Sequence, residues 1–511
     1  MKIVTSTALL SLAVLLSGWL GPSGAAILQV DGTPALHDPS TIIQADGKFY
    51  VYATGNGLPA FQSNDGWTWR RAGSVMQAVP GGKPGADVIA RGGNNTWAPD
   101  IIHVGDKYFL YYAAPGAQPK AAIGLLVGKT LDPDARDYTW EDGGPIVWSD
   151  GVEDSNAIDP GVLLDPTNGS LWLTYGSYFG YIRLVELDPK TGKRLHPDRK
   201  PIDIAINSEA SVMIYHDGWY YLLVTHGSCC AGANSTYNIR MGRARKVTGP
   251  FVDNMGIDML QGGGKLFVGS AGRHIGPGHF GLLDLGDGVE KFSCHYEADL
   301  DRGGISVLGI RPLLWRDGWP VAGDNFQEGT YEIESARTGT ALELAVEGVP
   351  VGGRRGAGGR GGRGGGRGEA APLPPVRDQD AAQVAGNWPS GPIAVRMSPY
   401  ILQAQQKWAV TPVANAGGYP GSPFFEITIA GTGRVLAATA DGEVIVLPAF
   451  TGGPEQLWRI DQLTDGTYRV MPKVAPNANQ SLALSAVGSS TPTLEAFNAA
   501  SDRQRWLFKT P

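Results

Sequence analysis

A hairpin unit recurs five times in the first 320 residues, and it limits the possible folds more than any other feature of the sequence. Each copy has a polar leading residue, a short apolar strand, a turn that contains Gly, and a second strand rich in aromatic residues. The leading residues lie 62, 59, 50 and 70 positions apart. A period near 60 residues that contains only strands predicts a β-propeller with five blades. The leading residues are Asp38, Asp100, Asp159, Glu209 and His279.

Composition agrees with many short strands joined by turns. The 511 residues include 73 Gly and 36 Pro, together with 14 Trp, 18 Tyr and 14 Phe. Turn-forming and aromatic residues in these numbers favour an all-β chain. With 42% hydrophobic and 18% charged residues, the chain can bury a core, which excludes global disorder. The net charge of −7 argues against nucleic acid as the main partner.

The five leading residues suggest a catalytic site. The first strand of each propeller blade lines the central channel, so we expect these residues to converge near one end of it. Gathering four acids and a histidine there is costly unless chemistry uses them, although Asp also begins hairpins for turn reasons alone. Two carboxyl groups across a channel suit hydrolysis of a glycosidic bond, one as proton donor and the other as activator of water. A third carboxylate would raise the pKa of the acid.

Six ordered segments lie between residues 30 and 322, one at nearly every predicted blade. They are His37-Asp38-Pro39-Ser40, Trp97-Ala98-Pro99-Asp100, Asn156-Ala157-Ile158-Asp159-Pro160, Ser208-Glu209-Ala210, Cys229-Cys230-Ala231-Gly232-Ala233-Asn234-Ser235-Thr236-Tyr237 and Gly276-Pro277-Gly278-His279. Together these segments resemble glycoside hydrolase family 43, and within it the endo-1,5-α-L-arabinanases.

The resemblance implies a five-bladed propeller and an inverting mechanism. It would make Asp38 the general base, Glu209 the general acid and Asp159 the residue that orients the acid and raises its pKa. Further residues are expected to contact substrate, with Trp97 stacking on a sugar face. The expected substrate contacts are His37, Trp97, Asp100, Asn156, Ser177 and Tyr178.

The resemblance also implies a metal beside His279, a hydrated ion taken as calcium. Calcium prefers oxygen ligands, so most of its shell would have to be water. One segment departs from the arabinanase pattern: residues 113–118 form a shorter stretch than this branch usually has, and they lack its aromatic residue. Fine specificity is therefore left open.

The last third of the chain has a different repeat. Gln-x-Trp occurs at Gln406–Trp408, Gln456–Trp458 and Gln504–Trp506, with the tryptophans 50 and 48 residues apart. This pattern resembles the ricin-type lectin β-trefoil and predicts such a domain over residues 326–511. Sugar sites in that family need an Asp in each unit. The positions that we align with it are Glu343, Ala438 and Ser485, so the domain is either a degenerate sugar-binding module or a structural one.

A run of Gly and Arg interrupts the first trefoil unit. Residues 352–368 contain five arginines, a composition that resembles RNA-binding Gly-Arg tracts. In an exported acidic protein we interpret it instead as a flexible insertion, disordered over about 352–390. Its positive charge suits contact with an acidic polysaccharide such as pectin.

The N-terminus predicts export. Lys2, an apolar run from Ala8 to Leu16 and small residues at 23–26 are typical of a signal peptide over residues 1–26, with an uncleaved anchor as the alternative. No later stretch has the length of apolar chain that a membrane helix needs, so we expect no membrane span in the mature chain. Three cysteines give no disulfide framework. Cys229 and Cys230 are adjacent, so a bond between them would be strained, and we expect both to serve packing.

Together these patterns predict an all-β enzyme, secreted or periplasmic and monomeric, with a propeller at 27–325 and a trefoil after it. The first hypothesis is endo-acting hydrolysis of α-1,5-linked arabinan, a polysaccharide associated with pectin. An exo-acting arabinofuranosidase or a β-xylosidase of the same family is the second. A lectin-like propeller without catalysis is the third. Endo or exo action, the exact linkage, a need for calcium and the oligomeric state stay open.

Overall fold

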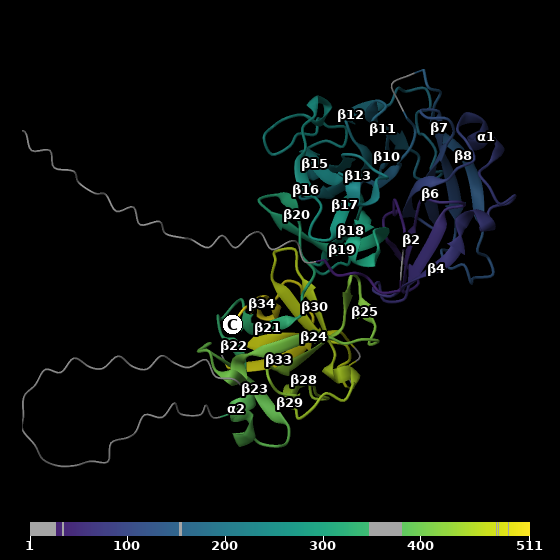
Figure 1. Cartoon of the computed structure of the whole chain (residues 1–511). Helices are drawn as coiled ribbons and strands as arrows, with labels where there is room; N and C mark the ends of the chain where they lie inside the picture. Colours follow the sequence, from purple (N-terminus) through teal and green to yellow (C-terminus); the bar gives the residue numbers. More distant parts are fainter. Residues whose placement is uncertain are drawn as a thin grey trace, which may run out of the picture.

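Two β domains follow one another along the chain (Figure 1). The computed structural model describes residues 27–32, 35–152, 156–346, 381–476, 478, 480–488 and 490–511. The first domain is a ring of five four-stranded sheets and the second is built around a barrel, so the predicted propeller and trefoil fold class is confirmed. The expected signal peptide and the Gly/Arg run at 352–368 lie outside the described residues.

Each blade is one continuous antiparallel stretch, with its inner strand first. The first blade contains β1 (Ile43–Ala45), β2 (Lys48–Tyr52), β3 (Pro59–Ser63) and β4 (Trp69–Ser74), and helix α1 (Ala86–Arg91) follows it. The second contains β5 (Trp97–Val104), β6 (Lys107–Pro115), β7 (Ala121–Gly128) and β8 (Trp140–Ser149). The third contains β9 (Gly161–Leu164), β10 (Leu171–Tyr175), β11 (Tyr181–Leu187) and β12 (Ile202–Ile206). The fourth contains β13 (Glu209–His216), β14 (Trp219–His226), β15 (Asn238–Ala244) and β16 (Lys265–Val268). The fifth contains β17 (His274–Asp284), β18 (Glu290–Asp299), β19 (Ile305–Arg316) and β20 (Trp319–Ala322).

Side chains that alternate along the second strands hold the blades together. On β6, Phe109 and Tyr111 pack toward the third blade, whereas Leu110 and Tyr112 pack toward the first. Strands β2 and β14 divide their side chains between two clusters in the same way, and five apolar clusters fill the five interfaces between blades. This is the period-2 pattern of a strand that is buried on both faces. The aromatic second strands of the sequence repeat are therefore the core of the ring.

The inner strands line the central channel, as the repeat predicts. A cavity of about 280 Å³ within it is bordered by residues from all five blades, which include Thr41, Ile102, Leu163, Ile214 and Leu282. The predicted hairpin turns also form. Asp46-Gly47 and Asp217-Gly218 are two-residue turns in which both residues have positive φ, the geometry that matches the twist of paired strands.

Six strands close the barrel of the second domain, and three hairpins complete a β-trefoil. The barrel strands are β21 (Gly329–Ser335), β24 (Trp408–Pro412), β27 (Phe425–Ile429), β30 (Trp458–Gln462), β31 (Tyr468–Pro472) and β34 (Trp506–Lys509). The hairpins are β22 (Ala341–Leu344) with β23 (Ile393–Ser398), β28 (Val435–Ala438) with β29 (Val444–Leu447), and β32 (Leu482–Val487) with β33 (Thr491–Ala496).

The three Gln-x-Trp motifs occupy equivalent places in this trefoil. Each tryptophan is fully buried, and its indole Nε1 donates to the backbone oxygen of Leu342, Leu436 or Leu484 at 2.9, 3.0 or 2.8 Å. The residues after these carbonyls are Glu343, Ala437 and Ser485, so the expected alignment of Ala438 in the second unit is wrong by one position.

The end of the predicted disordered insertion is folded, which corrects its boundary. Residues 381–390 include helix α2 (Ala381–Val384) and a 3-10 turn at Ala385–Asn387. Ala381 and Trp388 are buried in the trefoil core, and that apolar anchoring orders this stretch. Among the described residues, the structure contains no helix with the length and apolar character needed to cross a bilayer.

A short hairpin of the trefoil, β25 (Gly418–Tyr419) with β26 (Ser422–Pro423), contacts the propeller (Figure 1). Its Gly418 N–H donates to Asp65 Oδ2 at 3.0 Å, and its Gly421 N–H donates to the Gly66 oxygen at 3.2 Å; both acceptors belong to the outer turn of blade one. On blade five, Lys291 Nζ donates to the Pro420 oxygen. The hairpin thus touches the first and the last blade together.

Behind this hairpin, charges meet in a buried cluster. Asp461 is fully buried and pairs with Arg469 at 3.0 Å, with Arg459, and with Lys291 of the propeller at 3.7 Å. Burial alone would raise the pKa of Asp461, but the three cations hold it well below its usual value. The carboxylate is therefore the counter-ion on which the buried Lys291 and Arg469 depend.

We expect Asp461→Asn to destabilise the domain junction by about 3 kcal/mol, because removal of one member leaves buried charges uncompensated. The calorimetric transition of the trefoil should move to lower temperature. Asp465→Asn is the matched control: its ion pair with Arg505 is 47% exposed on the carboxylate side, and such pairs contribute about 1 kcal/mol or less. Equal transitions in the two variants would contradict the role given to Asp461.

Candidate active site

One residue at the mouth of each blade has a left-handed backbone. Its φ is 47° at Asp38, 55° at Asp159 and 59° at His279, in blades one, three and five, but 41° at Ala98 and 48° at Ala210 in blades two and four. The register of the inner strand shifts around this residue in blades two, four and five, as at a β-bulge. The predicted leading residues are thus equivalent in three blades, and the acids of the other two are displaced from the bulge.

Asp38 forms the centre of a hydrogen-bonded group. Its Oδ2 accepts from Thr54 Oγ1 at 2.6 Å and lies 2.9 Å from His37 Nδ1, and its Oδ1 lies 3.2 Å from His279 Nδ1. Burial alone would raise the pKa of Asp38, but the charge of His37 and the hydrogen bonds from both histidines hold it well below its usual range. Asp38 is therefore an ionised carboxylate.

Glu297 holds His37 from the other side. His37 Nε2 lies 3.0 Å from Glu297 Oε1, so both nitrogens of the ring face carboxylates. Burial opposes the charge of this ring, yet Asp38 and Glu297 together raise the pKa of His37 from 6.5 to about 10. His295 stacks on His37 with ring centroids 4.4 Å apart, and its Nδ1 accepts from the Asp38 backbone N–H at 3.0 Å. The group is a charged carboxylate–imidazolium–carboxylate chain.

The pKa values of Glu209 and Asp159 are raised, whereas the pKa of Asp38 is lowered. Burial raises the pKa of Glu209, and the charge of Asp38 adds to the shift, although Tyr237 OH donates a hydrogen bond that opposes it. Burial and the charge of Glu209 raise the pKa of Asp159 to about 8. Asp159 Oδ2 accepts from the N–H of Ala210, the residue after Glu209, at 3.1 Å. The site thus combines one carboxyl group whose pKa is lowered with two whose pKa is raised.

Asp100 does not join this group as predicted. It is buried, and its two oxygens accept the backbone N–H groups of Thr41 at 3.0 Å and Val162 at 2.9 Å. These residues lie in blades one and three, so Asp100 connects three neighbouring blades below the bulge. Because both carboxylate oxygens of Asp100 accept hydrogen bonds from backbone N–H groups, Asp100 supports the channel wall and is not placed to contact a substrate.

The other expected substrate contacts lie at or beneath the rim of the channel. Trp97 is 37% exposed and Tyr178 is 42% exposed. Asn156 and Ser177 are buried beneath them, joined by a hydrogen bond of 2.9 Å, and the side-chain oxygen of Asn156 has no protein partner in the described structure. Tyr178 OH donates to the Thr225 oxygen at 3.4 Å. These residues form an aromatic rim over a polar wall.

The fit of His279 to a calcium ion is partial. Its Nδ1 faces Asp38 and its backbone N–H donates to Thr225 Oγ1 at 3.0 Å, which leaves the ring Nε2 as the one donor atom for an ion. A single nitrogen suits calcium only where water supplies the other ligands. A separate group of possible metal ligands consists of His37, Asp38 and His295, with their ligand atoms within 4.8 Å of one another.

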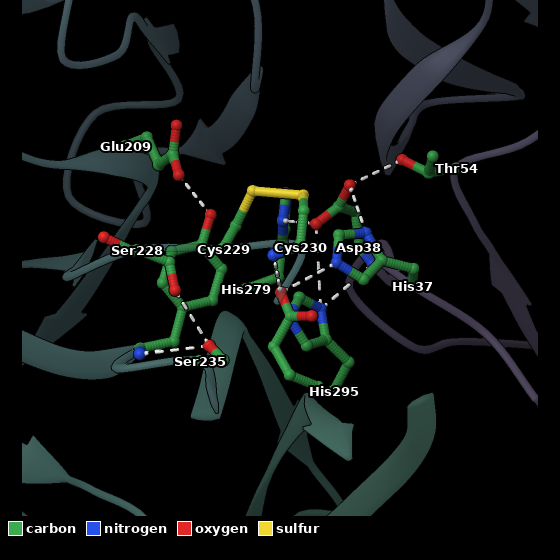
Figure 2. Close-up of a disulfide and its surroundings, with 12 residues drawn as sticks. His37, Asp38, Thr54, Glu209, Ser228, Cys229, Cys230, Ser235, His279 and His295 are labelled. Carbon is green, nitrogen blue, oxygen red and sulfur yellow. Dashed lines mark hydrogen bonds and ion pairs between the residues drawn. A yellow bond between two sulfur atoms is a disulfide. The ribbon is translucent and has the colours of Figure 1, made fainter. Parts of the chain in front are cut away.

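Sequence reasoning missed three side chains of the site and one covalent bond; Figure 2 shows His295 beside His37, and the bond between Cys229 and Cys230. His295 belongs to the fifth repeat, and Glu297 follows two residues later in the same strand. Tyr237 ends one of the quoted segments. Cys229 and Cys230 are joined by a disulfide, whereas the sequence led us to expect unbonded packing residues.

Comparisons with known proteins agree on one family. The family model described as glycosyl hydrolases family 43 matches residues 33–320. The extracellular endo-α-(1→5)-L-arabinanase 1 of Bacillus subtilis (strain 168) is 33% identical over 296 residues, 56% of this chain and 87% of its own length. The extracellular exo-α-(1→5)-L-arabinofuranosidase ArbA of Cellvibrio japonicus (strain Ueda107) is 32% identical over 56% of this chain and 85% of its own. The α-L-arabinanase of Cellvibrio cellulosa in complex with arabinohexaose has a TM-score of 0.52 and 29% identity, and the match covers 58% of this chain and 96% of that one.

The charge chain predicts how stability depends on pH. The folded pKa of His37, about 10, is raised above its ordinary 6.5, so its contribution is fully present below about pH 6.5 and is lost as pH rises toward 10. Glu297→Gln removes one carboxylate from the ring, which lowers the pKa of His37. We expect the melting temperature of the variant to finish its decline at lower pH than that of the parent.

Glu186→Gln is the control for this pH series. It removes a carboxylate that lies 3.8 Å from His196 Nε2, a ring that is 45% exposed, so it should leave the profile between pH 6 and pH 10 unchanged. Parallel profiles of parent and Glu297→Gln would rule out the proposed coupling.

Proposed function

Because this chain belongs to glycosyl hydrolase family 43 and is a glycoside hydrolase, we propose that it cleaves α-1,5-linked L-arabinan within the polymer and inverts the configuration at the cleaved bond. The observation that carries the proposal is that the pKa values of two carboxyl groups in one channel are shifted in opposite directions. The pKa of Asp38 is lowered and that of Glu209 is raised. Two such groups are the acid–base pair that glycoside hydrolysis needs.

In this mechanism Asp38 is the general base. Its two oxygens already accept hydrogen bonds from Thr54 and the two histidines, so its position is fixed before substrate binds. It removes a proton from the water that attacks the anomeric carbon. Glu209, whose pKa is raised by burial, donates a proton to the leaving oxygen. An inverting enzyme places the two carboxyls about 6.5–9.5 Å apart, with room for that water.

Asp159 is a positioning residue in this proposal. Its Oδ2 holds the backbone N–H of Ala210 and so fixes the start of β13, from which Glu209 projects. Its carboxyl group also interacts electrostatically with Glu209, and burial favours a neutral form. Two carboxyl groups that interact in this way lose their protons one after the other, so the pair retains a proton over a wider pH range than one free carboxyl group would.

The substrate assignment follows the relatives, which are named for arabinan chemistry. Trp97 and Tyr178 give the cleft aromatic faces on which a furanose ring can stack. A calcium ion with a water shell at His279 Nε2 would supply positive charge near the reacting sugar. The name of the Bacillus subtilis relative includes the word extracellular, and with the sequence of residues 1–26 it supports export of this chain, which we take to act as a monomer.

We infer that the second domain is a ricin-type trefoil with a structural role. Its three Gln-x-Trp motifs support the type. The positions aligned with sugar-binding aspartates do not face solvent: Glu343 is bound by Arg396 and Gln406, and Ser485 accepts from Gln504 at 3.0 Å. The third position, Ala437, is buried and has no polar side-chain atom. These three positions therefore cannot reach a sugar.

Glu209→Gln should lower kcat on arabinan by about 10²–10⁴-fold, because it removes the proton donor. An aryl arabinofuranoside with an acidic phenol as leaving group needs little protonation, so the same variant should retain far more of its activity on that substrate. Asp38→Asn, which removes the base, should lose activity on both. Equal losses of Glu209→Gln on the two substrates would contradict its assignment as the acid.

The products of linear debranched arabinan test the mode of action. We expect a mixture of oligosaccharides early in the reaction, measured by chromatography over time. Arabinose alone from the first time point would assign exo action instead, as in the Cellvibrio japonicus relative. Proton NMR of the first product should show inversion of the anomeric configuration, and retention would contradict the mechanism.

A further inference from the structure

The bond between Cys229 and Cys230 lies between Glu209 on one side and Asp38 on the other (Figure 2). Cys230 is exposed and Cys229 is partly exposed, although both belong to the loop between the buried strands β14 and β15. Cys230 has a left-handed backbone with φ of 62°. A cysteine pair that served the core would be buried, as Cys294 is. Both residues of this disulfide instead keep part of their surface accessible to solvent.

Its position relative to the base is well defined. Cys230 Sγ, a ring nitrogen of His37 and a carboxylate oxygen of Glu297 all lie within 4.8 Å of one another. The Cys230 backbone N–H also donates to Glu297 Oε1 at 3.2 Å. Since His37 holds Asp38 at 2.9 Å, the sulfur is one side chain away from the general base.

The same loop also reaches the acid. Ser228 and Thr236 pair across its neck, with Ser228 N–H donating to Thr236 Oγ1 at 2.9 Å and Thr236 N–H donating to the Ser228 oxygen at 3.2 Å. The next residue, Tyr237, donates to Glu209. The disulfide loop therefore extends from the side of Asp38 to the side of Glu209, and the disulfide lies between these two carboxyls (Figure 2).

We propose that the Cys229–Cys230 disulfide is a substrate-contacting surface, on which the C–H face of an arabinofuranosyl ring rests beside the cleaved bond. The inference depends on the proposed function for the identity of the sugar. Sulfur is apolar and polarisable, so it packs well against C–H groups. The exposed aromatics Trp97, Tyr178 and Phe179 belong to blades two and three. The disulfide provides the matching apolar surface on blade four.

The test compares the parent with Cys229→Ala/Cys230→Ala on linear arabino-oligosaccharides. Loss of the sulfur surface should raise KM about fivefold to tenfold, the effect of removing a few tens of Å² of apolar contact. The kcat should change by less than about threefold, because Asp38 and Glu209 keep their own partners. An unchanged KM would overturn the proposal, and so would a fall in kcat alone, which would mean that the loop acts on the catalytic groups and not on the sugar.

Reduction of the parent provides a second measurement if the double variant does not fold. Tris(carboxyethyl)phosphine opens the disulfide to two thiols, and the product is verified by mass after alkylation in the denatured state. We expect KM to rise on reduction and to return on re-oxidation. The double variant, if folded, should not respond to the reagent. Complete reduction with an unchanged KM would again overturn the proposal.

The outcome for the substrate is separate from the outcome for the disulfide. If the parent does not cleave arabinan, the proposed substrate fails, and the same KM comparison is then made on the polymer that the parent does cleave. If the parent cleaves arabinan and both proteins share one KM, only the disulfide inference fails.

Discussion

The left-handed residue at the mouth of each blade is the constraint on which the site depends. A side chain on such a residue leaves the strand in a direction that regular pleating does not allow, and this conformation costs roughly 1–2 kcal/mol for a residue with a Cβ. In blades one, three and five that residue is Asp38, Asp159 or His279, and each has neighbours that hold it. The strained backbone of the ring therefore lies at the mouth of the channel, where the titratable groups converge.

Electrostatics then separates groups of the same chemistry into different roles. Asp38 and Glu209 are both buried carboxyls, and burial raises the pKa of each. What distinguishes them is their partners: Asp38 faces two imidazoles, whereas Glu209 faces a phenol and the negative charge of Asp38. Glu297 acts on Asp38 indirectly, because it keeps His37 charged. The difference in pKa between the two carboxyls therefore depends in part on a residue that neither of them contacts.

The sequence was sufficient to predict the propeller, because alternation and Gly turns are local and each blade is one continuous stretch. It could not place the bulges, which depend on how strands pair, and so the leading residues of blades two and four were misaligned. Asp100 shows a second limit of sequence analysis. A carboxylate can bind backbone N–H groups as well as a substrate, and the sequence alone does not distinguish the two. Contacts such as that between His37 and Glu297 join residues 260 positions apart, and no local pattern indicates them.

The position of the trefoil hairpin at Gly418–Pro423 is important because of the way in which the propeller ring closes. Blades one and five are joined by packing of side chains, not by a strand that they share. The hairpin forms hydrogen bonds with Gly66 on one side of that seam and with Lys291 on the other. The contact between Asp38 and His279 crosses the same seam at the channel mouth. The second domain thus links the first and the last blade directly, and this link limits how far Asp38 and His279 can move apart across the seam.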